Sequence, residues 1–267
     1  MRKIVVLLLV GLIVLASGCI GKDVGLTKEK VLSAIENIET ARYDQNFSVT
    51  MHFTDPSTNR TVNITMSGRA MGVFNKTAGR ERGNMSMKTH TMGMDINFNW
   101  PYFINGTNAY INVDGKWYRV SSDDTIYSQA KGSLNVAYIE NLLEKKNVTI
   151  KKLANGYAFR VNVTFWEFVN ATNQTGYLNE VWGTLPGNVT VDTKSGWVEV
   201  HLRDDGTPVF IETYMDVVLK VTAVSEEPIE IHVAVHEEVR LSDVNEPVEI
   251  PVPAGITNAA DFGDGFW

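Results

Sequence analysis

The spacing of hydrophobic residues changes from a helical to a strand-like period near residue 43. Before this point, the apolar positions lie three or four residues apart, and Thr27 precedes them as a helix N-cap. This spacing predicts one helix over residues 27–42 with a single apolar face. The positions that define the face are Val31, Ala34, Ile35, Ile38 and Ala41.

From Tyr43 onward, apolar and polar residues alternate, which is typical of half-buried antiparallel strands. Similar alternation occurs in residues 61–70, 157–165, 198–202, 209–221 and 229–241. Asp114-Gly115 and residues 203–208 have the composition of hairpin turns. Residues 84–100 read as one long strand with a bulge near Gly93, because the apolar parity changes there. A further short helix is expected over residues 134–143.

These elements predict a mainly β (α+β) fold. We expect a strongly curved antiparallel meander sheet, a half-barrel, which clasps the N-terminal helix and carries one further short helix. The Pro-rich residues 246–255 predict an extended edge segment. No linker divides the chain, so residues 27–256 form a single predicted domain and residues 257–267 a flexible tail.

The N-terminus predicts export and lipidation. An apolar run at residues 4–16 follows Arg2 and Lys3, and it is shorter than the roughly 20 residues that span a bilayer. The sequence from Leu15 to Cys19, the only cysteine, resembles the lipobox of prokaryotic lipoproteins, although Ala16 occupies a position where Leu is commoner. This resemblance implies a signal peptide over 1–18, a lipid on Cys19, a tether over 19–26 and attachment to the outer face of the cell membrane.

Two other interpretations of this N-terminus are an inert cysteine after an ordinary signal peptide and a short membrane helix. An unpaired cysteine in an exported protein needs an explanation, and lipidation supplies one. A single acyl chain anchors a protein only marginally, so we expect a lipid with more than one chain.

Asparagine occurs in an unusual context along the chain. Half of the 22 asparagines begin an N-x-Ser/Thr triplet without proline, which is a formal glycosylation acceptor. Such triplets also arise where two solvent-facing residues alternate on a strand. Both interpretations place the asparagines on the surface. The candidate glycosylation sites are Asn46, Asn59, Asn63, Asn75, Asn84, Asn105, Asn147, Asn162, Asn170, Asn173 and Asn188.

Composition and motifs point away from several kinds of function. A net charge of −7 argues against a nucleic-acid partner. The sequence has no HExxH, GxSxG or P-loop motif, so we expect neither catalysis nor a cofactor or metal site. His232 and His236 share a strand face but lie about 13 Å apart at about 3.3 Å per residue, too far to bind one metal. Glu237 interrupts an apolar run and is expected at a cavity mouth or a bulge.

The order of a helix followed by long strands resembles the LolA-like fold, which periplasmic lipoprotein carriers share with mycobacterial lipoproteins of the LprG type. The resemblance is carried by the patterns of residues 31–53, 109–120 and 244–255. It implies an apolar hollow between the sheet and the helix. Seven methionines in residues 51–94 fit an adaptable pocket, and they equally fit an ordinary core.

The leading hypothesis is a lipid-anchored surface protein that binds a lipid or another hydrophobic ligand. The alternatives are a non-catalytic surface glycoprotein with a structural or adhesive role and, third, an enzyme. The predicted cavity wall takes one parity from each strand: Phe47, Val49, Met51, Ile64, Met66, Met92, Met94, Phe98, Phe159, Val161 and Val163.

Overall fold

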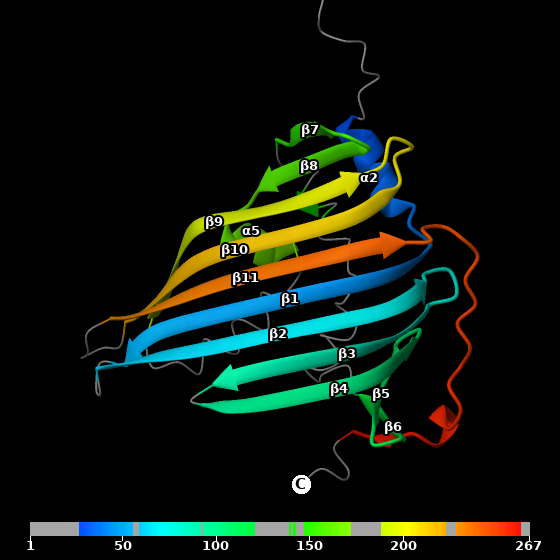
Figure 1. Ribbon diagram of the computed structural model, residues 1–267, viewed down its shortest axis with the longest axis horizontal. Helices are drawn as coiled ribbons and strands as arrows, with labels where there is room; N and C mark the ends of the chain where they lie inside the picture. The colour runs from blue at the N-terminus through cyan, green and yellow to red at the C-terminus, as the bar shows by residue number, and fades with distance from the viewer. Residues whose placement is uncertain are drawn as a thin grey trace, which may run out of the picture.

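One open, curved sheet contains all twelve strands of the described part of the chain (Figure 1). The computed structural model describes residues 27–55, 59–91, 93–120, 139, 141–142, 147–171, 188–222 and 228–262. The first six strands are β1 (Thr40–Asp55), β2 (Arg60–Asn75), β3 (Arg80–Thr91), β4 (Met94–Asn105), β5 (Asn108–Val113) and β6 (Lys116–Val120). The others are β7 (Thr149–Leu153), β8 (Gly156–Asn162), β9 (Asn188–Leu202), β10 (Pro208–Thr222), β11 (Ile229–Ser242) and β12 (Ala260–Asp261).

The sheet consists of two meanders joined in the middle. Its strand order is β12-β6-β5-β4-β3-β2-β1-β11-β10-β9-β8-β7. Neighbours are antiparallel throughout except for the short parallel pair of β12 with β6. The predicted mainly β class with an antiparallel sheet is therefore confirmed, but β1 and β11, from opposite ends of the domain, lie side by side (Figure 1).

The N-terminal helix α2 (Lys28–Glu36) lies behind the sheet in the view of Figure 1. Val31 and Ile35 are each 1% exposed and belong to the main core with apolar residues of the strands. The helix is shorter than predicted, because the chain leaves it at Asn37, whose side-chain amide donates back to the Ser33 carbonyl at 2.7 Å. Ile38 and Ala41 are also buried, but they lie beyond the helix.

A second helix, α5 (Phe165–Ala171), replaces the end of a predicted strand. Its N-terminus is a capping box: the Thr164 backbone N–H donates to Glu167 Oε2 at 2.8 Å, and the Glu167 N–H donates to Thr164 Oγ1 at 3.4 Å. The alternation through Phe165 was therefore wrongly extended by three residues. Of the helix predicted over 134–143, the described residues 139, 141 and 142 are helical, and Ile139 and Leu142 are buried.

The region read as one long strand over residues 84–100 is a hairpin. β3 ends at Thr91, β4 begins at Met94, and these two residues are paired. Gly93 has φ +77°, a left-handed conformation that suits a tight turn better than a bulge within a strand. The predicted bulge was wrong, because a two-residue turn also switches the parity of the apolar side chains.

The C-terminal segment after β11 crosses one end of the neighbouring strands as a strap, residues 243–262. Figure 1 shows it, orange to red, reaching β6 at the sheet edge through η1 (Ile256–Asn258) and β12. Asn245 fixes its start: its Oδ1 accepts from the Glu39 N–H at 2.8 Å and its Nδ2 donates to the Asn37 carbonyl at 2.9 Å. Residues 257–262, expected in a flexible tail, form the end of this strap.

The two faces of the sheet differ in chemistry. One face carries the alternating apolar residues and the main core. The other is rich in charged side chains, such as Arg69, whose guanidinium donates to both carboxylate oxygens of Asp44 at 2.7 and 2.8 Å. Exposed pairs of this kind contribute little to stability, so the fold depends mainly on the apolar face, while on the other face a smaller cluster of Phe103, Ile250 and Ile256 packs the strap against the sheet. We use "apolar face" and "polar face" for these two sides below.

Gly68 tests the packing of the apolar face. A Cβ at this position would collide with the Phe47 ring and lie 2.9 Å from the Ser86 carbonyl oxygen. We expect Gly68→Ala to lower the free energy of unfolding by about 1–3 kcal/mol, measured by urea denaturation.

The double variant Gly68→Ala/Phe47→Leu should be more stable than the sum of the two single changes implies, because leucine leaves room for the methyl group. Ser67→Ala on the polar face is the control. Simple additivity of the two changes would contradict this packing.

Candidate functional site

The apolar face contains a field of side chains that the rest of the described chain does not bury. Strand register aligns its residues in rows: Phe47 is paired with Gly68, Val49 with Met66, and Met51 with Ile64. The rows extend into β3 and β4 on one side and into β11 on the other. We call this set the apolar field: Phe47, Val49, Met51, Ile64, Met66, Met87, Met94, Ile96, Phe98, Val233 and Val235.

Burial decreases along the strands toward the field. Tyr43 and Gln45 in β1 are buried, whereas Phe47, Val49 and Met51 are half-buried. At the start of β4, Met94 is 58% and Ile96 43% exposed. Single exposed apolar residues are ordinary, but a contiguous patch drawn from five adjacent strands is typical of an interaction surface.

The predicted cavity wall separates into two groups. Phe47, Val49, Met51, Ile64, Met66, Met94 and Phe98 all lie in the apolar field. Phe159, Val161 and Val163 are at most 4% exposed and belong to the main core. Met92 lies outside the described residues.

A polar pair lies where the apolar field meets the main core. Gln45 Nε2 donates a hydrogen bond to Glu237 Oε1 at 2.6 Å, linking β1 to β11. Gln45 is 8% exposed, and its Oε1 is buried without a hydrogen-bond partner. Glu237 of β11 is half-buried, and its cross-strand partners are Phe47 of β1 and Thr213 of β10, which is 1% exposed. The sequence identified Glu237 as an interruption, but Gln45, which breaks the same parity in β1, was missed.

The apolar surroundings change the pKa of the Glu237 carboxyl group. Desolvation raises the pKa of Glu237 above its ordinary value, and the hydrogen bond from Gln45 opposes the shift without cancelling it. An ionised carboxylate is therefore costly at this position. The pair combines a carboxyl group that favours protonation with an amide oxygen that lacks a donor.

A second carboxyl group on the apolar face already accepts hydrogen bonds within the protein. Glu81 Oε1 accepts hydrogen bonds from the hydroxyl groups of Tyr43 and Tyr102, each at 2.6 Å. Tyr43 and Tyr102 are 4% and 2% exposed. This arrangement ties β1, β3 and β4 together, and it satisfies the tyrosine hydroxyl groups within the core.

The polar face brings together three side chains that could hold a metal ion. Glu212, His236 and Glu238 offer ligand atoms within 4.8 Å of one another, and His236 Nε2 lies 2.8 Å from Glu212 Oε1. His232 is stacked on His52 with ring centroids 4.5 Å apart and takes no part. Sequence spacing within one strand could not find this group, because Glu212 comes from the neighbouring strand β10. The Glu238 carboxylate also accepts from Arg240 at 3.3 Å, so charges within the cluster are already partly balanced.

Most of the sequon asparagines are exposed, as the strand registers predicted for Asn46, Asn63 and Asn162. Asn75 and Asn84 are half-buried, and their amide nitrogens donate to the Val248 carbonyl at 3.2 Å and to Asn99 Oδ1 at 2.8 Å. Asn173 lies outside the described residues. The other exposed asparagines are Asn59, Asn105, Asn147, Asn170 and Asn188.

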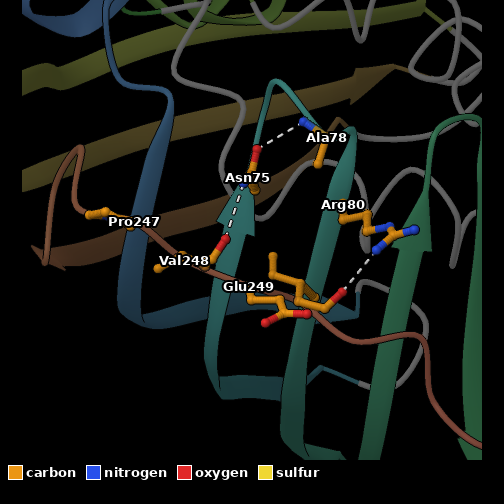
Figure 2. A pocket seen from close by; sticks show the side chains of 7 residues that line it. Asn75, Ala78, Arg80, Pro247, Val248 and Glu249 are labelled. Atoms are coloured by element: carbon orange, nitrogen blue, oxygen red, sulfur yellow. Dashed lines mark hydrogen bonds between the residues drawn. The ribbon is translucent and has the colours of Figure 1, made fainter.

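A shallow groove of about 430 Å³ lies between the β2–β3 turn and the strap, away from the apolar field. Figure 2 shows that its polar groups hold the strap in place: Asn75 donates to the Val248 carbonyl, and Arg80 donates to the Ile250 carbonyl at 3.2 Å. Its other lining residues are Ala78, Pro247 and Glu249. These bonds explain the groove as a junction between the strap and the sheet.

Cys19, the signal peptide and the tether lie outside the described residues. Within the described ranges, neither α2 nor α5 has the length and apolar character that a helix needs to cross a membrane.

Comparison with known proteins gives distant resemblances. No protein-family model matches the chain. An uncharacterized protein of Methanocaldococcus jannaschii is 27% identical over 157 residues, which are 57% of this chain and 60% of that relative. The match therefore covers less than two thirds of the relative's length.

Among solved structures, LprF from Mycobacterium bovis is 13% identical with a TM-score of 0.40, over 85% of this chain and 95% of that one. A structure of lipovitellin, described for its lipid–protein interactions, is 10% identical with a TM-score of 0.33, over 80% of this chain and 26% of that one. The function proposed for the chain rests on its own side chains.

The raised pKa of Glu237 predicts a pH-dependent stability difference. Because the folded-state pKa lies above the unfolded value of about 4.5, folding is disfavoured as pH rises through the folded-state pKa. Glu237→Gln should therefore become more stable relative to the parent as pH increases from about 4.5, by about 1.4 kcal/mol for each unit of the shift. Urea unfolding at several pH values measures this difference in the free energy of unfolding between the variant and the parent.

Glu230→Gln on the polar face of the same strand is the matched control with the opposite sign. The hydrogen bond from Lys220 lowers the Glu230 pKa, so this variant should lose stability relative to the parent at neutral pH and recover it in acid. Equal pH profiles for the two variants would refute the assignment.

Proposed function

We propose that the chain is a lipid-anchored extracytoplasmic protein that binds a lipid, or a hydrophobic molecule with a long alkyl chain, on its apolar field. The observation that carries this proposal is that Phe47, Val49 and Met51 of β1 are half-buried and lie in rows with their partners in β2 and β11. Flexible methionines are prominent in the field, and such side chains adapt to ligands of varied shape.

The dimensions and chemistry of the field favour an alkyl chain over a protein partner. The eight residue steps from Gln45 to Phe53 extend about 26 Å along β1, the length of a long alkyl chain. The field contains no charged side chain, and its carboxyl and amide neighbours lie at the Gln45–Glu237 end, whereas Thr89 and Thr91 of β3 separate its β2 residues from Ile96 and Met94 of β4. Burying apolar area yields about 25 cal/mol per Å², which suffices for lipid binding without catalysis. We accordingly propose a binding role and no enzymatic activity.

The location and the anchor are part of the same proposal. The lipobox-like sequence ending at Cys19 supports attachment to the outer face of the cell membrane. The numerous sequons support an extracytoplasmic location, and their exposed asparagines favour the alternative of a surface glycoprotein with a structural or adhesive role. The two roles differ in whether the apolar field takes up a ligand.

Two charged substitutions in the field test binding. Met94→Asp and Ile96→Asp alter side chains that are already 58% and 43% exposed, so the fold should tolerate them. The double variant should bind long-chain ligands at least about 10-fold more weakly, because a ligand that covers the β4 side of the field must desolvate both carboxylates. Native mass spectrometry of the intact chain released from detergent measures the bound fraction.

The control adds the same two charges to the polar face, with Asn63→Asp and Asn97→Asp, and should bind like the parent. If the parent binds no long-chain ligand, or if both double variants bind equally, the carrier proposal fails and the glycoprotein alternative gains support.

Mass spectrometry of the protein from its native membrane tests the anchor and the glycans together. The N-terminal peptide should begin at Cys19 and carry the mass of a lipid. Glycans should occur on exposed sequons such as Asn46, Asn63 and Asn162, but not on Asn75, whose amide nitrogen is hydrogen-bonded to the strap. An unmodified Cys19 peptide would rule out the lipoprotein assignment, and a glycan on Asn75 would mean that the strap detaches there.

A further inference from the structure

The polar pair at the inner end of the apolar field has features of a binding site for the ligand's polar end. Gln45 and Glu237 occupy the row positions where burial changes from the main core to the half-buried field. A chain lying along Phe47, Val49 and Met51 would therefore end at this pair. The opposite end of the field, at Met94 and Ile96, opens to solvent.

The amide of Gln45 is incompletely satisfied. Its nitrogen donates to Glu237 Oε1 at 2.6 Å, whereas its oxygen is buried and has no partner. Few buried polar atoms in native proteins lack a hydrogen bond, and each one calls for an explanation. Phe47, two residues along β1 on the same face, is half-buried, so rotation of its side chain is the movement that would admit a ligand group.

The type of unsatisfied atom determines the type of ligand group. An amide oxygen accepts a hydrogen bond, so it selects a donor such as a hydroxyl group. An ester offers acceptors alone and leaves the Gln45 oxygen unsatisfied. A fatty-acid carboxylate offers acceptors and adds a negative charge beside the Glu237 carboxyl group, in surroundings that already disfavour charge.

We infer that Gln45 and Glu237 hold the polar end of the ligand, and that this ligand is a neutral long-chain lipid whose polar end carries a hydroxyl group. This inference rests on the proposed function, since it assumes that the apolar field takes up the alkyl chain. The lipid's hydroxyl hydrogen is donated to Gln45 Oε1. Selection thus depends on the polar end, while the field accepts the chain without strict shape requirements.

Three ligands of equal chain length test the inference: oleyl alcohol, methyl oleate and oleate. The intact chain should bind oleyl alcohol about 10-fold or more tightly than methyl oleate, and oleate more weakly than the alcohol, because a buried acceptor left unsatisfied is costly. Competition between the ligands is measured by native mass spectrometry. The Met94→Asp/Ile96→Asp variant should weaken all three alike.

Two variants separate ligand selection from folding. Gln45→Met removes the amide, and Gln45→Met/Glu237→Leu replaces both polar partners with apolar groups, which leaves no unpaired carboxyl group. In both variants the ratio of alcohol to ester binding should fall to about 1, with methyl oleate affinity retained. Thermal unfolding confirms that the double variant folds.

Each outcome has a distinct meaning. Failure of the parent to bind any of the three ligands contradicts the proposed function itself. Equal binding of alcohol and ester, tighter binding of the ester, or oleate binding as tight as that of the alcohol overturns the inference while the proposed function stands. A preference for the alcohol that survives in the double variant also overturns it, since another group would then make the selection.

Discussion

The pairing of β1 with β11 is the interaction on which the rest of the sheet depends. It runs over twelve residue pairs, from Arg42–Ser242 to Phe53–Ile231, and joins two meanders in which all other neighbours except β12 and β6 are consecutive strands. Hairpins between consecutive strands close short loops, whereas this pairing brings together residues about 190 positions apart. Its register also places the alternating apolar side chains of both meanders on the same face of the sheet. The apolar field, the main core and the contact between Gln45 and Glu237 all depend on this register. A shift of one residue would move each side chain of β11 to the other face.

The same register explains why the two ends of the apolar face differ. Near the start of β1, Tyr43 is buried in the main core, which also contains α2 residues Val31 and Ile35, and the hydroxyl groups of Tyr43 and Tyr102 both donate to Glu81. Toward the end of β1, the alternation continues with residues that the described chain buries only in part. The continued alternation is the physical basis for proposing a ligand.

The sequence predicted the parts of the fold that depend on local pattern. Alternation assigned Phe47, Val49 and Met51 to one face, and Asp114-Gly115 forms the expected turn, with φ values of 51° and 83°. Local pattern gave wrong predictions where one spacing of apolar residues is compatible with two different structures. The change of parity near Gly93 fits a bulge and a hairpin turn equally well, and the alternation through Phe165 hid the capping box of Thr164 and Glu167. The β1–β11 pairing left no local signal, and therefore the contact between Gln45 and Glu237 could not be predicted. The cluster of Glu212, His236 and Glu238 was missed for the same reason, since Glu212 and His236 come from different strands.

Under the proposed function, the pair of Gln45 and Glu237 would give specificity at the expense of stability. An apolar residue at position 45 would extend the parity of Tyr43 and Phe47 and leave no unsatisfied oxygen in the core. Replacing both members of a buried polar pair by apolar groups is often neutral or stabilising, so the pair is not explained by the fold alone. A hydrophobic surface by itself discriminates weakly among ligands, because area is its main requirement. A buried acceptor at one end adds directional discrimination, since a ligand without a donor must leave that acceptor unpaired. The combination of an adaptable apolar field with one fixed polar end is therefore a physical basis for a carrier that tolerates varied chains and selects a single type of polar group.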